Sequence, residues 1–413
     1  MPPHEGLVHP KEYDIKDSNV ELIGSDLDHR VKYNSAASEP AWNNGTIGQQ
    51  PGLFIWRIEN FEVVPWPKER TGEFYDGDSY IVLHTYAVGN GEDRKLGHDI
   101  FFWLGSKTTQ DEAGTAAYKT VELDEFLHGA ATQHRETQRH PSGDFVSLFR
   151  RISIRAGGVA SGFTHVEPEV KQNVLTLLRV FKHPGAGRVD SVIVHEVEPT
   201  WRSLDDGDVF VLDKGDKIWV WQGKSCSPME KAKSAQVVND MVLAKHVKVE
   251  VLSQLEARSK VFVDLLDGRD INQLSFQAPR PIAFPPSSSN KHAGASGGNA
   301  ASPPRKLFRL SDASGTLTFT LVKDGGRITR ADLDGNDVFL YDVGNTLWVW
   351  QGLNASAKEK TLWIKVAQSY VRQELLRGQQ EDDEAASNDA HLIPIAKVLE
   401  GHESPAFLRA LDS

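Results

Sequence analysis

The stretch that decides the fold reads DGDVFVLD at 206–213 and IWVWQG at 218–223. Both runs are rich in β-branched and aromatic residues, and the Lys, Gly and Asp residues between them predict a hairpin of two strands. After the second run, residues 228–243 change to a helical spacing of apolar positions. Pro228 suits the first turn of that helix, because its missing N–H would be unpaired there. The stretch therefore predicts a sheet with a long helix packed on it.

The same pattern occurs three times in the chain. A second copy, GNDVFLYD at 335–342 with LWVWQG at 347–352, follows at a constant offset of 129 residues. A weaker copy reads DGDSYIVL at 76–83 and IFFWLG at 100–105, and its strand-to-helix spacing is 12 residues longer. We expect that insertion in the hairpin around 88–97. Three copies of one unit predict three α+β modules, because the period is too long for a solenoid.

The segments between the copies set the domain boundaries. Residues 1–50 are polar, with Trp42 almost the only large apolar side chain, and we expect an N-terminal extension that adds little core. Residues 278–305 are rich first in Pro and then in Ser and Gly, which predicts a flexible linker. The polar run at 377–389 predicts a surface loop inside the last module. The modules are therefore expected at 51–163, 164–277 and 306–413.

Composition excludes several classes of protein. The net charge of the 413 residues is −11, which argues against non-specific nucleic-acid binding through clustered basic residues. Cys226 is the only cysteine, so an intrachain disulfide and a thiolate zinc site are both excluded. The N-terminus lacks a secretory pattern, and no apolar run is long enough to span a bilayer. We expect a soluble protein of the cell interior.

In every copy an Asp stands at the start of a strand and a Glu stands near the start of the following helix. Each residue alone has a structural explanation, since Asp forms turns and the helix dipole favours an N-terminal Glu. Their recurrence at matched positions favours a metal, because two carboxylates and a backbone carbonyl are ligands that Ca²⁺ recruits. The pairs are Asp78 with Glu112, Asp208 with Glu230 and Asp337 with Glu359.

Other chemistries fail on inspection of the motifs. The run DLDGND at 332–337 suggests a helix-loop-helix calcium loop, but its glycine is displaced and position twelve is Val343 instead of Glu. The chain has no His-Glu-x-x-His, no phosphate-binding loop, no nucleophile elbow and no dinucleotide fingerprint. The polar tetrapeptide at 133–136 is interpreted as a loop that is solvated or locally hydrogen-bonded, without a catalytic role. The motifs therefore do not predict an enzyme.

The predicted helix at 110–127 carries more apolar residues than one core face requires. One stripe faces the core in the usual spacing, and a second stripe lies beside it, edged by Asp124 and Glu125. A stripe this wide indicates either deeper burial or a docking surface. The core stripe is Ala113, Ala116, Thr120, Leu123 and Leu127; the second stripe is Gly114, Ala117, Tyr118 and Val121.

The first copy resembles a known actin-binding module. WLGSKTTQDEAGTAA at 103–117 is followed by VELD at 121–124, QHRE at 133–136 and GGVASGF at 157–163, and this combination resembles the first domain of the gelsolin family. The resemblance covers the chain from about Pro51 onward and is strongest to the three-domain severin and fragmin type. It implies an α+β fold in which each module packs a mixed β-sheet between a long and a short helix.

The resemblance also implies a function. It predicts a non-enzymatic, calcium-dependent protein of the cytoplasm and actin cytoskeleton that severs actin filaments and caps their barbed ends, monomeric when free. The alternative within the family is capping or monomer binding without severing. A calcium-requiring hydrolase would need a paired acid and nucleophile, which the sequence does not offer, and a scaffold of degenerate modules would show no stabilisation by calcium.

By the family pattern, each module binds one calcium ion, and module one shares a second ion with actin through Asp124 and the carbonyls of Gly129 and Ala131. The last ligand of module two has no match, and Asp264, Asp267 and Asp270 are its candidates. The ligands implied for the ions within the modules are Gly77, Asp78, Glu112 and Val159 in module one, Gly207, Asp208 and Glu230 in module two, and Asn336, Asp337 and Glu359 in module three, the glycines, Val159 and Asn336 through their carbonyls.

The same pattern implies which residues meet actin and lipid. The helix at 110–127 would enter the cleft at the actin barbed end. Module two would hold the filament side through cations that include Lys231 and Lys233, although a solvated helix face explains any single lysine equally well. The expected barbed-end contacts are Tyr118, Val121, Asp124, Glu125 and Phe163; a thin phosphoinositide-binding cluster is expected from Arg150, Arg151, Arg155, Arg179 and Lys182.

Overall fold

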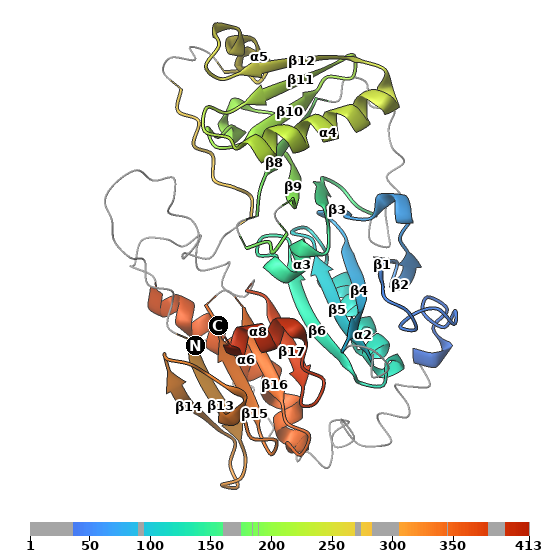
Figure 1. Cartoon of the computed structure of the whole chain (residues 1–413), viewed down its shortest axis with the longest axis vertical. Helices are drawn as coiled ribbons and strands as arrows, with labels where there is room; N and C mark the ends of the chain where they lie inside the picture. Colours follow the sequence, from blue (N-terminus) through green and yellow to red (C-terminus); the bar gives the residue numbers. More distant parts are fainter. Residues whose placement is uncertain are drawn as a thin grey trace, which may run out of the picture.

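The computed structural model describes residues 36–89, 95–159, 175–183, 185–188, 190–268, 274–282, 305–344, 346–378 and 393–412. These residues form three modules, each with a sheet, a long helix and a short helix (Figure 1). Modules one and three lie side by side, and module two lies beyond one end of module one. The α+β fold class is confirmed. None of the described helices is long and apolar enough to cross a membrane.

Module one packs its sheet between helices α2 and α3. The core on the α2 side contains Ala116 and Leu123, and the core on the α3 side contains Phe145 and Val146. The long hairpin of β4 and β5 contains the expected insertion. The elements are β1 (Gly52–Glu59), β2 (Glu62–Pro65), β3 (Glu73–Tyr75), β4 (Ser79–Val88), β5 (Lys95–Leu104), α2 (Gln110–Phe126), β6 (Ala131–Thr137), α3 (Gly143–Ser147) and β7 (Arg151–Arg155), with a 3₁₀ turn at Lys68–Arg70.

Module two repeats this plan with shorter strands. Its long helix α4 begins with Ser227 as N-cap and Pro228 in the first turn, as the sequence predicts. The elements are β8 (Thr176–Phe181), β9 (Val192–Val197), β10 (Val209–Asp213), β11 (Lys217–Gln222), α4 (Pro228–Lys245), β12 (Lys248–Ser253) and α5 (Lys260–Asp264), with 3₁₀ turns at Trp201–Ser203 and Ala257–Ser259.

Module three has the same order of elements. Its long helix extends to Gly378, so the start of the predicted surface loop at 377–389 is helical, and the rest of that loop lies outside the described residues. The elements are β13 (Lys306–Ser311), β14 (Thr318–Asp324), β15 (Val338–Asp342), β16 (Leu347–Gln351), α6 (Ala357–Gly378), β17 (Ile395–Leu399) and α8 (Pro405–Asp412), with a 3₁₀ turn at Arg330–Asp332.

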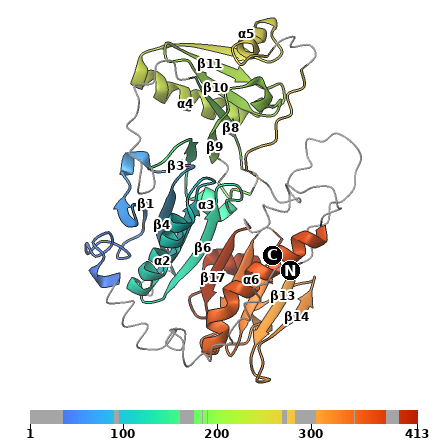
Figure 2. The ribbon, with the colours of Figure 1, turned by 180° about the vertical axis from the view of Figure 1, so that it is seen from behind.

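Two sheets run across module boundaries. Strand β17 of module three pairs antiparallel with β6 of module one, with Ala396 opposite His134, and joins their strands into one ten-stranded sheet. Strands β7 and β3 extend the sheet of module two, with β7 parallel to β9, into seven strands. Figure 2 shows β17 beside β6 from the opposite side. The repeat units are therefore not independent in the hydrogen bonding of their sheets.

Two expectations for the segments that flank the modules are wrong for the residues that the structure describes, and so is the loop expected at 133–136. The end of the N-terminal extension adds core, because Trp42 and Ile47 are buried against the α2 side of module one. The first residues of the predicted linker, 278–282, are packed, because Ile282 is buried in the core of module one, and 283–304 lie outside the described residues. The tetrapeptide at 133–136 belongs to strand β6, and its side chains alternate between half-buried and buried instead of forming a solvated loop.

The Trp-x-Gly motif ends each hairpin because the chain passes very close to itself there. A Cβ at Gly105 would collide with the backbone carbonyl of Asp76, and at Gly223 and Gly352 it would collide with the equivalent carbonyls. Only glycine permits this approach. The same turn lets the amide of Gly105 donate to the carbonyl oxygen of Asp78 at 3.0 Å, so the hairpin end fixes the start of β4.

His195 connects modules one and two and is neutral in the fold. Its Nδ1 donates to the carbonyl of Glu196 at 2.8 Å, and its Nε2 accepts from the amide of Gln138 at 3.2 Å, a tautomer inferred from these partners. Burial lowers the pKa of His195 to about 4. Protonation of His195 at Nε2 would place its N–H against the side-chain NH₂ of Gln138, so the folded state disfavours the charged imidazole.

We predict that the variant His195→Gln weakens the acid sensitivity of the fold. The unfolded chain takes up this proton below pH about 6.5 and the folded chain does not, so stability is lost as the pH falls from about 6.5 toward 4. Between pH 7 and 5 the native histidine costs about 2 kcal/mol. Urea unfolding at both pH values should show a smaller pH-dependent loss in the variant, and an unchanged difference would contradict the assignment.

Candidate functional site

The recurring aspartates occupy one equivalent, buried position in the three modules. Asp78, Asp208 and Asp337 are at most 2% exposed and stand directly before the first strand of each hairpin. Their backbone carbonyls accept hydrogen bonds at 3.0, 3.0 and 3.1 Å from the glycines that end the hairpins. A buried carboxylate is costly unless charge or hydrogen bonds compensate it, so each module must supply a partner.

The recurring glutamates are both helix caps and neighbours of these aspartates. Each is the third residue of its long helix, and its amide donates at 3.2 Å to the hydroxyl of the N-cap residue Thr109, Ser227 or Ser356. The structural explanation therefore accounts for part of the pattern. The Glu359 carboxylate accepts from the amides of Ser356 at 3.0 Å and Asp312 at 2.7 Å, which compensates its burial. Glu112 is 3% exposed and accepts only a longer bond, 3.3 Å from the hydroxyl of Thr108, among the contacts of the described residues.

In modules one and three, one carboxylate of the pair has a raised pKa. Burial raises the pKa of Asp78, and the charge of Glu112 adds to that shift. Burial likewise raises the pKa of Glu359, with further contributions from Asp312 and Asp337. Two like charges held close together in a poorly solvated position favour a cation between them.

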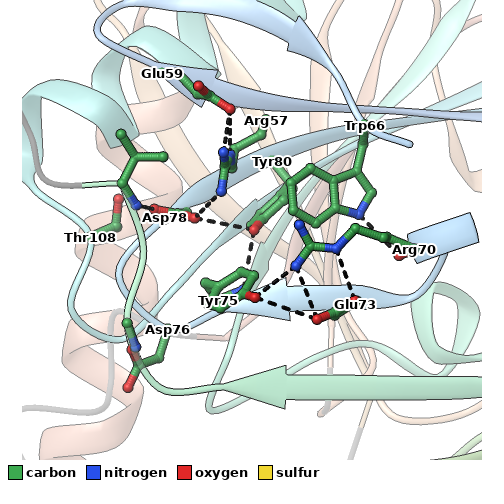
Figure 3. Close-up of polar contacts among 12 residues, drawn as sticks. Arg57, Glu59, Trp66, Arg70, Glu73, Tyr75, Asp76, Asp78, Tyr80 and Thr108 are labelled. Atoms are coloured by element: carbon green, nitrogen blue, oxygen red, sulfur yellow. Dashed lines mark hydrogen bonds and ion pairs between the residues drawn. The ribbon is translucent and has the colours of Figure 1, made fainter. Parts of the chain in front are cut away.

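An arginine on the neighbouring strand meets each aspartate, and the sequence analysis did not identify it. In module one, Arg57 points toward Asp78 (Figure 3), and its terminal nitrogen lies 3.4 Å from the carboxylate. In module two, Nε of Arg179 donates to Asp208 at 2.6 Å. In module three, Nε of Arg309 donates to Asp337 at 2.7 Å. The three arginines stand at the same strand register. A lone Arg inside an apolar strand was the signal that could have revealed them.

The Asp78 carboxylate is also held from the other side. Tyr80 donates to one oxygen at 3.2 Å, and the amide of Val159 donates to the other at 2.8 Å (Figure 3 shows the tyrosine side of this network). The amide of Gly77 donates to the carbonyl of Gly157 at 2.8 Å. These contacts bring three expected ligands, Gly77, Asp78 and Val159, into one place. Glu112, the fourth, acts on Asp78 through its charge.

The donor set fits a calcium ion. Carboxylate and carbonyl oxygens are the ligands that Ca²⁺ prefers. The part of the chain that the structure describes holds no cluster of three or more His, Cys, Asp or Glu side chains, so backbone carbonyls such as those of Gly207 and Asn336 would have to complete the coordination. Of the candidates for the last ligand in module two, Asp264 and Asp267 are exposed in and after α5, and Asp270 lies outside the described residues.

Asp124 forms a second polar centre at the end of α2. Its carboxylate accepts from the amide of Ala131 at 3.0 Å and from the side chain of Gln133 at 2.6 Å, and its carbonyl accepts from the amide of Gly129 at 2.8 Å. Burial raises the pKa of Asp124, while the nearby charge of Lys397 on β17 acts in the opposite direction. The expected residues of the shared site therefore lie together, beside module three.

The two stripes of α2 differ in exposure. Ala116, Thr120 and Leu123 of the core stripe are buried. Tyr118 of the second stripe is 54% exposed, and Val121 and Glu125 are half-buried. An exposed tyrosine beside apolar residues has the exposure and composition that a protein-docking surface requires. Phe163, the remaining expected contact, lies outside the described residues.

The comparisons with known proteins agree with the repeat. The family model described as Gelsolin repeat matches residues 60–146, 190–256 and 323–408. The chain belongs to the gelsolin family. Gelsolin-like protein 1 of Lumbricus terrestris is 38% identical over 89% of this chain and 92% of its own length, and Gelsolin-like protein 2 of the same worm is 36% identical over 98% and 99%. Severin of Echinococcus granulosus is 33% identical over 89% and 92%. Membership assigns the chain to a family of actin-binding proteins.

One residue of the expected lipid-binding cluster, Arg179, is buried inside module two instead of lying on the surface. Arg179 is 1% exposed and paired with Asp208, so its inclusion among phosphoinositide-binding residues is wrong. Lys182 is half-buried, and its amide donates to Glu230 at 3.0 Å. Lys231 is exposed on α4, as a filament-binding cation must be.

The remaining cations gather between modules one and two. Arg150, Arg151, Arg188 and Lys233 line an open hollow of about 520 Å³ between α4 and the start of β7. Arg155 lies further along β7 and is within 4.0 Å of Glu196. The hollow is positively charged, and its ability to bind phosphoinositides remains a prediction from the family pattern.

We predict that Gly158→Ala destabilises module one around Asp78 by about 1–3 kcal/mol. Gly158 has φ of +157°, and a Cβ there would collide with the Asp78 carboxylate. Gly114→Ala is the matched control, because nothing lies within 4 Å of a Cβ at this helical position and alanine should stabilise α2 by about 0.5–1 kcal/mol. Thermal unfolding of both variants tests the pair, and equal stabilities would refute the close approach.

Proposed function

We propose that this gelsolin-family protein binds actin in a calcium-dependent manner, severs filaments and caps their barbed ends. The observation that carries the proposal is the buried Asp–Glu pair that recurs in all three modules, each time with an arginine at the equivalent position of the neighbouring strand. Helix capping accounts for the Glu of each pair and does not account for the buried Asp in the neighbouring turn.

The second stripe of α2 supplies the actin contact in this proposal. Tyr118 presents a large, partly apolar side chain, and Val121 and Glu125 lie one turn and two turns further along the same side of the helix. An amphipathic helix that presents such a row can insert its apolar side into a groove of a partner. The buried core stripe holds the helix rigidly on module one, which reduces the entropy lost on binding.

The ion of module one would be held by Asp78, Glu112 and the backbone carbonyls of Gly77 and Val159. The equivalent residues would hold the ions of modules two and three. Bound Ca²⁺ supplies a divalent positive charge that neutralises two buried carboxylates at once and gathers about 6–8 oxygen ligands. The strand arginines contact Oδ2 of Asp78, Asp208 and Asp337, so each can stay in place while Oδ1 of the same carboxylate serves the ion.

Asp124 links calcium to actin and to module three. In the structure its carboxylate accepts from Ala131 and Gln133 and lies near Lys397 of β17. The β6–β17 pairing holds module three against this end of α2. A ligand that prefers the separated arrangement would release module three, and actin and calcium would then strengthen each other's binding reciprocally.

The alternative function is capping or monomer binding without severing. Severing requires a second grip on the filament side, and the exposed Lys231 beside half-buried Lys233 on α4 offers module two as that grip. The proposed setting is the cytoplasm, and the proposed action involves no covalent chemistry.

The test is fluorescence microscopy of labelled actin filaments, with and without calcium. Severing produces new breaks along filaments, and capping stops growth at barbed ends without breaks. Breaks that appear only with calcium are expected. Growth arrest without breaks would favour the alternative, and the absence of both effects at all calcium concentrations would overturn the proposal.

We predict that Tyr118→Ala weakens binding to actin monomers by about 10- to 100-fold in calcium, because truncating an exposed aromatic anchor removes most of its contact area. Leu243→Ala is the matched control, since Leu243 is equally prominent on the corresponding helix of module two. Titration of labelled monomer measures both affinities. A loss of similar size in both variants would show that α2 is not the specific contact.

A further inference from the structure

Module two differs from its neighbours in the number of cations on its aspartate. Asp208 accepts from Arg179 at 2.6 Å and also from Arg280, whose terminal nitrogen lies 2.6 Å from the other carboxylate oxygen. Nε of Arg280 is 3.3 Å from Asp208 as well. Among the described residues of modules one and three, a single arginine contacts each equivalent aspartate, Arg57 on Asp78 and Arg309 on Asp337.

Arg280 also reaches the second carboxylate of the same site. Its guanidinium lies 3.9 Å from Glu230 and packs over the ring of Phe181, with 5.4 Å between the guanidinium carbon and the ring centroid. The side chain is 29% exposed, while Asp208 is fully buried and Glu230 is 5% exposed. One positive group therefore bridges the Asp–Glu pair that would otherwise bind a metal ion.

The arginine belongs to a short segment that crosses the module boundary, residues 278–282, here called the strap. The amide of Ala278 donates to the carbonyl of Leu204 at 3.1 Å. Arg179 donates to the carbonyls of Pro279 at 2.8 Å and Ala278 at 3.1 Å. At its other end Ile282 is 1% exposed in the core of module one. The strap thus spans from module two to module one across Asp208.

We infer that Arg280 is an internal counter-cation that occupies the carboxylate pair of module two and must leave when a divalent ion binds there. The inference rests on the proposed metal site and adds to it a competitor contributed by this chain. Arg179 holds Oδ2 of Asp208 and Arg280 holds Oδ1, each at 2.6 Å, so both oxygens already face a guanidinium. A divalent ion that takes Oδ1 therefore displaces Arg280, because two cations cannot share that oxygen at contact distance.

The competition has a direct structural consequence. Loss of Arg280 from the site removes the side-chain attachment of the strap to Asp208 and leaves the contacts of Arg179 with the strap carbonyls as its remaining hold on module two. The other end of the strap is buried in module one. Occupation of module two is thereby coupled to the contact between modules one and two. By linkage, the factor by which ion binding weakens the attachment of the strap is also the factor by which the attached strap weakens ion binding at module two.

The experiment is calorimetric titration of the full chain with calcium chloride. Binding at module two is defined as the heat lost in the variant Asp208→Asn. Arg280→Gln should tighten this component by about tenfold, the size expected for removing one charged hydrogen-bonded competitor. Arg258→Gln removes the same charge from an exposed site on module two and should change the affinity by less than about twofold. In the double variant Asp208→Asn/Arg280→Gln the gain should vanish.

A second variant and a second readout guard against misfolding of Arg280→Gln. Ile282→Ala loosens the far end of the strap while keeping Arg280, and it should also tighten calcium binding at module two. In the wild-type chain, hydrogen exchange of a peptide covering 274–282 should speed up when calcium is added and should stay unchanged in Asp208→Asn.

The outcomes separate the inference from the function on which it rests. An Asp208-dependent heat of equal affinity in wild type and Arg280→Gln overturns the counter-cation while leaving the metal site intact. Unchanged exchange of the strap on calcium addition overturns its displacement. Absence of any Asp208-dependent heat in every variant overturns both the inference and the proposed metal site of module two.

Discussion

The structure depends on a buried aspartate that starts a strand and must be neutralised. In each module the turn that ends the hairpin fixes the Asp backbone, and an arginine from the adjacent strand meets its carboxylate. A buried charge pair contributes little to net stability, since desolvation offsets the attraction. It does make the position sensitive to any additional cation, which is the property that a calcium-responsive module requires.

The three modules use this sensitivity differently. In module one, Asp78 takes hydrogen bonds from Tyr80 and Val159 and a long contact from Arg57. In module two, Asp208 is enclosed by two guanidinium groups. The same repeated aspartate therefore has different partners in each module, and some of these, such as Val159 and Arg280, come from segments outside the repeat.

The sequence predicted what the repeat itself specifies. Alternating and helical spacings located the hairpins and the long helices, and the matched Asp and Glu positions indicated residues that the structure brings together. Arg57, Arg179 and Arg309 were missed because loops of different length separate them from their aspartates, so no constant spacing marks them. Trp42 and Ile282 were missed because a lone apolar residue in a polar or Pro-rich segment gives no periodic signal for its burial.

The pairing of β17 with β6 could not be predicted for a similar reason, since no local pattern specifies which distant strand covers an edge. This pairing has a cost that appears only when the modules separate. Both strands would then present unpaired backbone amides and carbonyls to the solvent, and such edges readily pair with strands of other molecules. Lys397 on β17 and Arg135 on β6 place charge along these edges, which limits self-association of the opened chain without filling the missing hydrogen bonds.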